Sequence, residues 1–454
     1  MAVPNAARSA VAPAYLFACL ILGGSAQGIW QNAALQLVGL CIIAWTAVDN
    51  GGEPVTGQAR RLLLIAMAGI GVVALQTLPL PPSIWAQGAR AQIAEGYRLL
   101  GMPVPWLPIS VSPFGSLSAL LCVIPALAMF IAVVRFDSYH PSWLAAALLA
   151  GTGGGILLGA LQAMNAGTAS EWYLYPQTNV GRAVGFFANA SHMAILLIVT
   201  VPFAAAIAAA GRSRNMQRFS ALIAILIAIT ILLVVGVALN GSLAGYLLIA
   251  PAIAASALIV LPRRSRFRRP LAALAGLGAV GAIAILASMS LGSVLISHNA
   301  STSFQSRSEI LATTGKAVSD FTPWGSGLGS FAKVYRLYES PAVVTDEWVV
   351  HAHNDYVETA LELGVAGVVL VALFLVWWGR AAQQAWKRSD VSPFAFAAAI
   401  ASATILLHSL VEFPLRTAAM SVCFAMCLGL LADRRQPPRK EVGDLRPTRH
   451  VVIR

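Results

Sequence analysis

Two histidines, one amide and three acids stand together in a short segment of an otherwise apolar chain. The segment runs from His351 to Gly364 and reads HAHNDYVETALELG. It joins a long polar stretch to an apolar run, so we expect His353 to lie where water meets membrane. An imidazole titrates near neutral pH and can take a proton from a hydroxyl group. The segment therefore predicts a general base at His353.

The same residues also have structural interpretations. A solvated loop histidine needs no function, and Asp355 with Glu358 has the spacing of a capping box at a helix start. His351 and His353 with Asp355 would begin a metal site. Beyond these residues no further clear ligand stands nearby, so we expect neither zinc nor any other metal or cofactor.

Three arginines in other polar stretches are candidates for holding an anion. Arg182 lies in the stretch NVGRAVGFFAN, which ends at Asn189. Arg307 lies in the first turn of a predicted helix, where free backbone N–H groups and a guanidinium favour phosphate. Arg416 follows Glu412 by four residues, which favours an ordinary ion pair. An arginine at a membrane edge can also simply reach for lipid headgroups, and this alternative stays open.

A histidine with two or three arginines suggests transfer of a group from an activated phosphate. The arginines would hold the pyrophosphate of a lipid-linked donor and neutralise its charge as it departs. The histidine would deprotonate an incoming sugar hydroxyl, and each charge-assisted contact would contribute roughly 1.5–3 kcal/mol. Because pyrophosphate is a good leaving group, direct attack with inversion at the sugar requires neither an acid partner nor a metal.

The elements that must position these residues are membrane helices. The chain has 454 residues, of which 58% are hydrophobic and 11% charged, and its mean hydropathy is +0.75. Soluble domains carry about 25% charged residues, and apolar runs of about 20 residues span a bilayer. Because no alternation of period two is present, the spans are helices rather than barrel strands. The sequence therefore predicts an all-α polytopic membrane protein, with residues 1–454 forming a single integral membrane domain.

About twelve spans are expected from the apolar runs. Their ranges are 12–30, 31–48, 61–80, 116–134, 142–164, 191–210, 219–238, 243–261, 270–292, 357–378, 393–410 and 415–432. The first could also be a signal peptide, because residues 24–26 mimic a cleavage site, but we expect a retained anchor. The five cysteines all lie in apolar runs, so no disulfide framework is implied.

Basic clusters set the expected orientation. The net charge of +12 would suit a nucleic-acid partner, but the basic residues stand in short groups between apolar runs. The groups at 212–218, 263–269, 380–388 and 434–440 follow every second span, which marks the cytoplasmic side. Both termini are then cytoplasmic, the candidate residues lie on the opposite face, and no nucleic acid is bound. The basic tail at 434–454 is expected to be disordered.

A large outer loop at 293–356, between the ninth and tenth spans, is expected to contain short helices. Ser306 and Glu309 have capping-box spacing, which predicts an amphipathic helix over about 307–320. The glycines of PWGSGLG at 323–329 follow it. Because no strand precedes them, they predict a turn that lets two backbones approach closely rather than a dinucleotide-binding loop.

Three stretches together resemble the family of O-antigen ligases and O-antigen polymerases, which are bacterial envelope glycosyltransferases. The family pairs a histidine with an asparagine ahead of a helix bearing an acid and a glycine, matched here by His353, Asn354, Glu358, Glu362 and Gly364. The supporting stretches are RxxGxxxN from Arg182 to Asn189 and the run from Arg307 through 323–331. The resemblance covers roughly residues 175–375. Many members carry Ser-Arg-Gly after the seventh span, where this chain has SLA, so the role of Ser242 is open.

The resemblance implies a multispan glycosyltransferase of the bacterial inner membrane that acts at the periplasmic face. Its donor would be a glycan linked to undecaprenyl pyrophosphate. It implies a catalytic role for His353 and binding of the donor pyrophosphate by Arg182 and Arg307. Supporting roles are expected for His351, Asn354, Glu358, Asn189, Gly327, Gly329 and Arg416.

The acceptor stays open, and we favour the ligase version. A ligase would glycosylate a hydroxyl of the lipid A–core, whereas a polymerase would extend a second lipid-linked glycan of an O-antigen or exopolysaccharide. An oligosaccharyltransferase would modify a protein. A transporter, also surrounded by membrane lipids, is the rival class, but transporters bury ionisable residues near the bilayer midplane. Here Glu358 and Glu362 stand near the outer end of the tenth span, and His408 is the most interior candidate.

Overall fold

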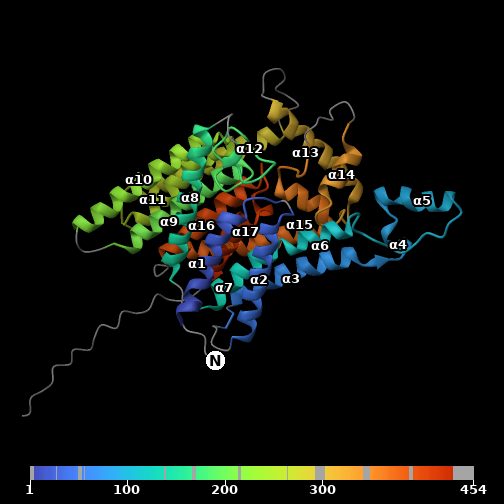
Figure 1. Ribbon diagram of the computed structural model, residues 1–454, viewed down its shortest axis with the longest axis horizontal. Coiled ribbons are helices and arrows are strands. Elements are labelled where there is room, and N and C mark those ends of the chain that lie inside the picture. Colours follow the sequence, from blue (N-terminus) through green and yellow to red (C-terminus); the bar gives the residue numbers. More distant parts are fainter. Residues whose placement is uncertain are drawn as a thin grey trace, which may run out of the picture.

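The computed structural model describes residues 5–26, 28–49, 54–55, 57–136, 140–165, 170–212, 216–262, 264–291, 302–340, 348–387 and 392–432. In these ranges nearly every element is a helix (Figure 1). The α-helices are α1 (Asn5–Leu22), α2 (Trp30–Val48), α3 (Gly57–Thr77), α4 (Pro82–Trp85), α5 (Ala91–Leu99), α6 (Pro113–Leu121), α7 (Ile124–Arg135), α8 (Pro141–Met164), α9 (Ala190–Ala210), α10 (Met216–Asn240), α11 (Leu243–Val260), α12 (Arg268–Leu291), α13 (Thr302–Phe321), α14 (Phe331–Tyr338), α15 (Asp355–Lys387), α16 (Pro393–His408) and α17 (Ala418–Ala432). The short 3-10 helices are η1 (Gly88–Arg90), η2 (Ser170–Trp172) and η4 (Pro414–Arg416). Two short strands, β1 (Pro79–Leu80) and β2 (Leu107–Pro108), pair antiparallel.

Within the described ranges, nine helices are long and apolar enough to cross a membrane. They are α2, α3, α6 with α7, α8, α9, α10, α11, α12 and α15. Three shorter apolar helices, α1, α16 and α17, occupy the remaining predicted spans. The expectation of an all-α polytopic membrane protein is therefore confirmed, and each of the predicted apolar ranges contains a helix.

The first predicted span, 12–30, is displaced. Helix α1 runs from Asn5 to Leu22, and a non-helical stretch follows. Gly24 explains this end, because its backbone passes directly against Phe186: an added Cβ would lie 1.9 Å from the Phe186 carbonyl oxygen. The Gly24 carbonyl also accepts a hydrogen bond from the Ala188 N–H at 3.1 Å. A tertiary contact therefore ends this helix before the apolar run is exhausted.

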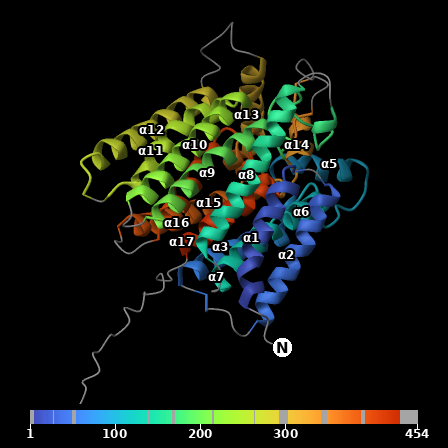
Figure 2. The same ribbon diagram turned by 60° about the vertical axis from the view of Figure 1, so that its left-hand side comes forward.

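Helix α9 lies at the centre of the bundle. Of its apolar span, 83% is buried, compared with 11% for the spans of α10 and α12. It packs against α8, α10, α11 and α16, while α17 packs against α7 and α1. Figure 2 shows α10, α11 and α12 side by side along one flank. These outer helices expose leucines and isoleucines that suit contact with lipid, whereas α9 is enclosed by protein.

Helix α15 is interrupted at Gly364, and the glycine-rich turn at 323–329 fits against the interruption. The φ of Gly364 is 60° and its ψ is −146°, outside the helical region. The Val365 N–H donates to the Pro323 carbonyl at 2.9 Å, and the Gly327 N–H donates to the Glu362 carbonyl at 2.9 Å. A Cβ on Gly364 would lie 2.1 Å from the Pro323 oxygen. The predicted close approach of two backbones is therefore confirmed.

Two of the three glycines of this turn, Gly327 and Gly329, also allow it to pack against α6 and the segment before it. A Cβ on Gly327 would lie 2.2 Å from Ser110 Oγ, and one on Gly329 would lie 2.7 Å from the Gly115 carbonyl oxygen. Both glycines also have positive φ, of 101° and 72°. Their expected supporting role is therefore to let this turn seat against α6 and the segment before it.

The predicted loop helix is present, but its predicted start is wrong. Helix α13 begins at Thr302, so Ser306 lies inside it rather than at its N-cap. A Ser-x-x-Glu pattern fits a helix interior as well as a helix start, so the pattern alone does not fix the first residue. Ile310 and Phe321 of α13 pack against Phe331 of α14. The remaining parts of the 293–356 loop, at 293–301 and 341–347, and the 434–454 tail lie outside the described residues.

An arm formed by residues 78–112 extends from the bundle after α3 and contains β1, α4, η1, α5 and β2 (Figure 1). Buried Arg90 donates to the carbonyls of Ile109 and Gly325 and so joins the arm to the turn at 323–329. The Trp85 indole N–H donates to the Pro105 carbonyl at 3.1 Å and closes the arm on itself. The base of the arm is thus fixed beside the interruption of α15.

Candidate active site

Two clusters of ion pairs lie where α15 begins and the connection between α16 and α17 passes over it. We call this part of the molecule the site end. The Asp355 N–H donates to the Ser409 carbonyl at 3.0 Å, and Asn354 Nδ2 donates to the Leu410 carbonyl at 2.9 Å. These bonds fasten the histidine segment to the 409–417 connection. Acids and bases that are distant in sequence therefore meet here.

Asn354, rather than Asp355, caps the start of α15. Its Oδ1 accepts hydrogen bonds from the N–H groups of Tyr356 and Val357 at 3.0 and 3.1 Å. The predicted capping box of Asp355 with Glu358 is therefore wrong. An asparagine one position earlier satisfies the free N–H groups of the first turn, which leaves both acids for the ion pairs described below.

Glu412 joins His353 and Arg307 in the first cluster, which we call the Glu412 cluster. Glu412 Oε2 lies 3.2 Å from His353 Nδ1, and Oε1 pairs with the Arg307 guanidinium. Asn189, at the N-cap of α9, donates from Nδ2 to Oε2 at 3.5 Å. The Glu412 side chain is 0% exposed, while those of Arg307 and His353 are 34% and 28% exposed. A buried carboxylate thus holds two groups that remain open to a substrate.

The charge on Glu412 follows from its surroundings. Burial raises the pKa of this carboxyl, but the adjacent Arg307 guanidinium and then His353 lower the pKa by more, so it ends below its ordinary value. An ionised carboxylate only accepts hydrogen bonds, so a neutral His353 donates its Nδ1–H to Glu412. The Nε2 lone pair is then left to accept a proton, which is the state that a general base needs.

His353 also has an unusual backbone and an aromatic neighbour. Its φ is 52°, a left-handed value that few non-glycine residues adopt. Its ring meets Phe413 edge to face at 5.1 Å between centroids, and His351 and His192 contact the same phenyl ring at 4.2 and 5.0 Å. Strained residues of this kind persist where the surroundings over-determine them, often at functional sites. Phe413 and Glu412 together fix the plane of the His353 ring.

Arg416 forms the second cluster, with three acids of α15. Its guanidinium lies 3.0 Å from Glu362, 3.3 Å from Glu358 and 3.7 Å from Asp355. The predicted pair of Arg416 with Glu412 is therefore wrong. Pro414 and the 3-10 helix η4 intervene, so the two residues do not share the face of one α-helix.

The Arg416 cluster holds the histidine segment in place through Glu358. Burial lowers the pKa of the Arg416 guanidinium, but the carboxylates of Glu358 and then Glu362 and Asp355 raise this pKa by more. Arg416 therefore stays positively charged. Glu358 also pairs with His351 Nδ1 at 2.9 Å and accepts the Ala352 N–H at 2.8 Å. Arg416 is thus occupied by acids, and we assign it a supporting position rather than one in substrate binding.

Arg307 pairs with Glu412, but the expected helix N-terminus does not surround it. Because α13 begins at Thr302, Arg307 lies beyond the first turn, whose N–H groups are the ones left free. The predicted phosphate site at a helix start is therefore wrong. A partly exposed guanidinium with several N–H donors remains beside His353.

Arg182 lies at the site end but does not contact the Glu412 cluster. Its guanidinium is exposed and approaches the Gly241 carbonyl at 3.5 Å, and among the described residues no acid pairs with it. Ser242 Oγ lies 3.4 Å from Ser191 Oγ, and the Ser191 N–H donates to Asn189 Oδ1 at 2.8 Å. A row of polar groups therefore leads from Arg182 to Asn189, and Asn189 contacts the buried Glu412.

Glu412 is the site residue that sequence reasoning missed as a partner of His353. It stands between Val411 and Phe413, so an acid with apolar neighbours on both sides was the available signal. Among the described residues, no group of three or more histidines, cysteines or acids is arranged to hold a metal ion. Chemistry without a metal or cofactor stays a prediction.

The chain matches a known protein family over part of its length. No curated protein matches the chain. Residues 228–372, however, match the family model described as O-antigen ligase. The matched range includes Arg307, His353 and the three acids that bind Arg416, and it leaves Arg182 and Glu412 outside. The segment 228–372, which carries the histidine of the candidate site, therefore belongs to the O-antigen ligase family.

Proposed function

We propose that the protein is an O-antigen ligase-type glycosyltransferase. It moves a glycan from an undecaprenyl-pyrophosphate donor to a hydroxyl of the lipid A–core. The observation that carries this proposal is the Glu412 cluster, where a partly exposed histidine and a partly exposed arginine share one buried carboxylate. This arrangement supplies a base and a phosphate-binding group side by side, within the segment that matches the family.

In the proposed reaction, His353 Nε2 takes the proton from the acceptor hydroxyl. The acceptor oxygen attacks the anomeric carbon of the donor sugar, and the bond from that carbon to the pyrophosphate oxygen breaks. Undecaprenyl pyrophosphate leaves with the electron pair, and the configuration at the sugar inverts. The new imidazolium is stabilised by the Glu412 carboxylate at 3.2 Å from Nδ1. No step in this scheme uses a metal or cofactor.

The two arginines have different parts in this proposal. Arg307 lies next to His353 and neutralises charge on the phosphate nearest the breaking bond, although Glu412 already offsets part of its charge. Arg182 is exposed, and the Gly241 carbonyl is the only partner of its guanidinium among the described residues, so its positive charge is available for the second phosphate. Ser242 and Ser191 lie between them as neutral donors for the pyrophosphate oxygens.

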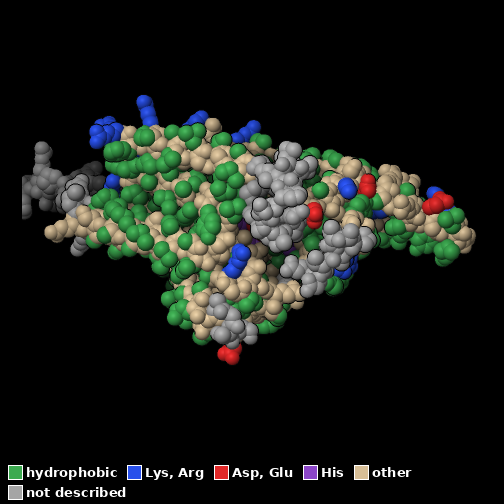
Figure 3. Space-filling view, turned by 90° about the horizontal axis from the view of Figure 1, so that it is seen from above, with side chains coloured by type: hydrophobic (Ala, Val, Ile, Leu, Met, Phe, Trp, Pro, Cys, Tyr) green, Lys and Arg blue, Asp and Glu red, His purple; other side chains and the backbone are tan. Residues whose placement is uncertain are grey.

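The site is proposed to face the periplasm of a bacterial inner membrane. Helix α9 begins beside Glu412 at Asn189 and ends near Arg212, so the basic group at 212–218 starts at the opposite end of the bundle. In Figure 3 several Lys and Arg side chains gather along the upper left edge, and others are scattered over the rest of this face. Basic groups of this kind mark the cytoplasmic side of membrane proteins. Both termini are then cytoplasmic.

The test is a gel profile of lipopolysaccharide, with lipid-linked glycan extracted in parallel. A deletion strain would carry the wild type, His353→Ala, His140→Ala as an exposed histidine control, or empty vector. We expect His353→Ala and empty vector to lose all O-antigen from the core and to accumulate long lipid-linked polymer. The base supplies on the order of 10²–10⁴-fold in rate, so its loss abolishes visible product. His140→Ala should match the wild type.

Other profiles would assign a different acceptor. Core bearing a single repeat in the deletion strain would make the protein an O-antigen polymerase, which shares this chemistry and the same family resemblance. An unchanged profile in every strain would exclude both lipopolysaccharide roles, and exopolysaccharide and transport assays would then decide. If His353→Ala fully restores the wild-type profile of the deletion strain, the assigned acceptor would stand, but His353 would not be the base.

A further inference from the structure

The arm at 78–112 carries an apolar surface on the outside of the molecule. Helix α5 places Ile93 and Tyr97 along one side, which Leu100 continues at the C-cap, and Glu95 with Arg98 on the other. The acid and the arginine form an exposed ion pair at 3.1 Å. The large apolar side chains that stay exposed on the arm include Leu99, Leu100, Met102 and Trp106. The arm is therefore amphipathic, with its charged pair opposite an uncovered apolar side.

The arm leaves the bundle at the depth of the interruption in α15. Gln76, at the end of α3, donates to the carbonyls of Trp324 and Glu362 at 2.8 and 3.0 Å. Between Asp355 and Glu362, α15 carries three acids, whereas residues 365–378 are uncharged and mostly apolar. The interruption at Gly364 thus separates a polar half-helix from a hydrocarbon-compatible one. The base of the arm lies at this border.

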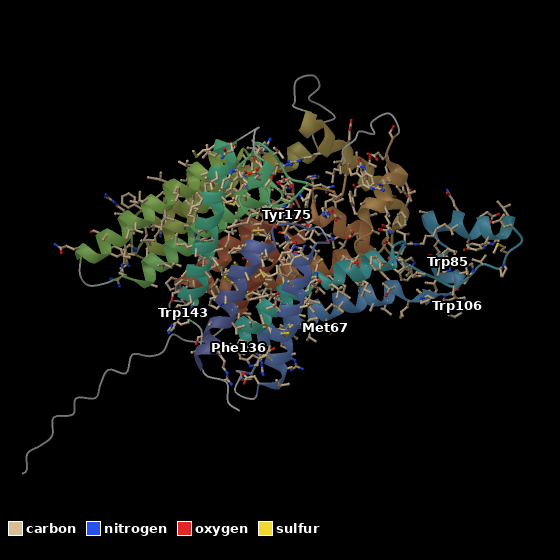
Figure 4. The ribbon with its side chains drawn as sticks, in the orientation of Figure 1. Met67, Trp85, Trp106, Phe136, Trp143 and Tyr175 are labelled. Atoms are coloured by element: carbon tan, nitrogen blue, oxygen red, sulfur yellow. The ribbon has the colours of Figure 1, made fainter. Side chains whose placement is uncertain are left out.

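The apolar side of the arm continues the surface of the neighbouring spans. Helix α3 exposes Met67 and Leu75, and α6 exposes Phe114 and Leu117. Met67 of α3 and Trp106 of the arm lie along the same edge of the molecule in Figure 4. Because the candidate span of α3 is only 22% buried, and that of α6 with α7 only 39%, their outer surfaces are those that lipid covers.

We propose that the arm lies in the membrane surface at the site end, with Leu100 and Trp106 among the lipids and the Glu95–Arg98 pair toward water. Amphipathic segments bind membranes in this way when one side is apolar and the other charged, and tryptophan is enriched at this depth. Lipid fits better than a second copy of the chain, since the surface is continuous with the lipid-facing sides of α3 and α6. Arg90 of the arm donates to the Gly325 carbonyl. The position of the arm in the membrane surface would therefore help to position the turn that supports α15.

The depth of two positions on opposite sides of α5 tests the proposal. Nitroxide labels would be placed on Leu100→Cys and, as the matched control, Glu95→Cys, each in the full chain with Cys41→Ser and Cys122→Ser. The other three cysteines are buried. The protein would be reconstituted in nanodiscs of phosphatidylethanolamine and phosphatidylglycerol. Collision rates would be measured with oxygen, which concentrates in lipid, and with a water-soluble nickel chelate.

We expect the label at position 100 to collide with oxygen and to be shielded from nickel, and the label at position 95 to show the reverse. If nickel reaches both labels equally, the arm stands in water and the proposal is wrong. If the label at position 100 is shielded from both reagents and shows dipolar broadening, a second copy covers the surface and the proposal is again wrong. Neither outcome depends on activity, so the result is independent of the proposed function.

Discussion

The tautomer of His353 decides whether its outward nitrogen can accept a proton. A carboxylate at Glu412 only accepts hydrogen bonds, so it selects the tautomer with hydrogen on Nδ1 and leaves the Nε2 lone pair open. A carboxamide in its place can donate to Nδ1 and so select the opposite tautomer. The volume and the contact would be retained while the base is lost. A glutamine at position 412 therefore changes the charge and the direction of the hydrogen bond to His353 while the shape of the side chain is kept.

Glu412→Gln is expected to lower the rate of glycan transfer by on the order of 10²–10⁴-fold, the range that a positioned base contributes. Single-turnover transfer by the purified protein, with saturating lipid-linked donor, would measure it. Glu309→Gln, at an exposed acid of α13, is the matched control and should keep the wild-type rate. A wild-type rate in Glu412→Gln would remove the carboxylate from the mechanism and leave His353 without an orienting partner.

The two arginines should respond differently to truncation. Arg182→Ala is expected to raise the donor KM roughly tenfold to a hundredfold, because a charge-assisted contact contributes about 1.5–3 kcal/mol. The melting temperature should not fall, because Arg182 has no ion-pair partner among the described residues.

Arg307→Ala should lower both kcat and the melting temperature, because it removes the cation that pairs with buried Glu412. Donor titrations and thermal unfolding in detergent would measure both. Arg98→Ala, on the arm, is the control.

Sequence reasoning found two of the three members of the Glu412 cluster but could not pair them with the third. Arg307 and Glu412 are separated by 105 positions, and His353 and Glu412 by 59, so no local pattern links them. The spacing of four residues suggested that Arg416 pairs with Glu412, which requires both to lie on one α-helix. Pro414, between them, starts a short 3-10 helix, so they do not share an α-helix. Residue types were readable from the sequence, whereas their partners depend on how α13, α15 and the 409–417 connection meet.

At the scale of elements, the support for the site depends on a helix that is broken at one glycine. The polar half of α15 carries the acids that bind Arg416, and the turn at 323–329 enters the break and bonds to both sides of it. Apolar runs revealed the spans because their length matches the bilayer. The break at Gly364, the arm at 78–112 and the early end of α1 were not readable, because each is set by a tertiary contact.

Gly364→Ala is expected to destabilise the protein and lower transfer activity together. The new Cβ would lie 2.1 Å from the Pro323 oxygen, and a φ of 60° disfavours any L side chain. The turn would have to withdraw, and the acids around Arg416 would lose their support. Gly379→Ala, on the same helix, is the control: an added Cβ there meets nothing within 4 Å, so stability should hold or rise by up to about 1 kcal/mol. Thermal unfolding of both variants would check this, and equal melting temperatures would mean that the break is not essential.

At the scale of the whole molecule, the candidate site and the basic group that begins at Arg212 lie at opposite ends of α9. The two ion-pair clusters and Arg182 lie at the site end, while α9 leads away from it to the basic group that begins at Arg212. A lipid-linked pyrophosphate donor is amphiphilic, so a site at the membrane border can receive its headgroup while its chain stays in lipid. The proposed transfer requires that this end face the compartment where the glycan is displayed, so orientation is a condition of the mechanism.

Orientation can be tested with two cysteines at opposite ends. Val180→Cys, in the loop that contains Arg182, and Phe267→Cys, in the basic loop before α12, both replace exposed apolar residues. In spheroplasts of a strain carrying Cys41→Ser and Cys122→Ser, a membrane-impermeant maleimide should label Val180→Cys at once. It should label Phe267→Cys only after permeabilisation, because basic loops stay cytoplasmic. The reverse pattern would put His353 and Arg307 in the cytoplasm, and a periplasmic transferase would then be ruled out even if their substitution abolished activity.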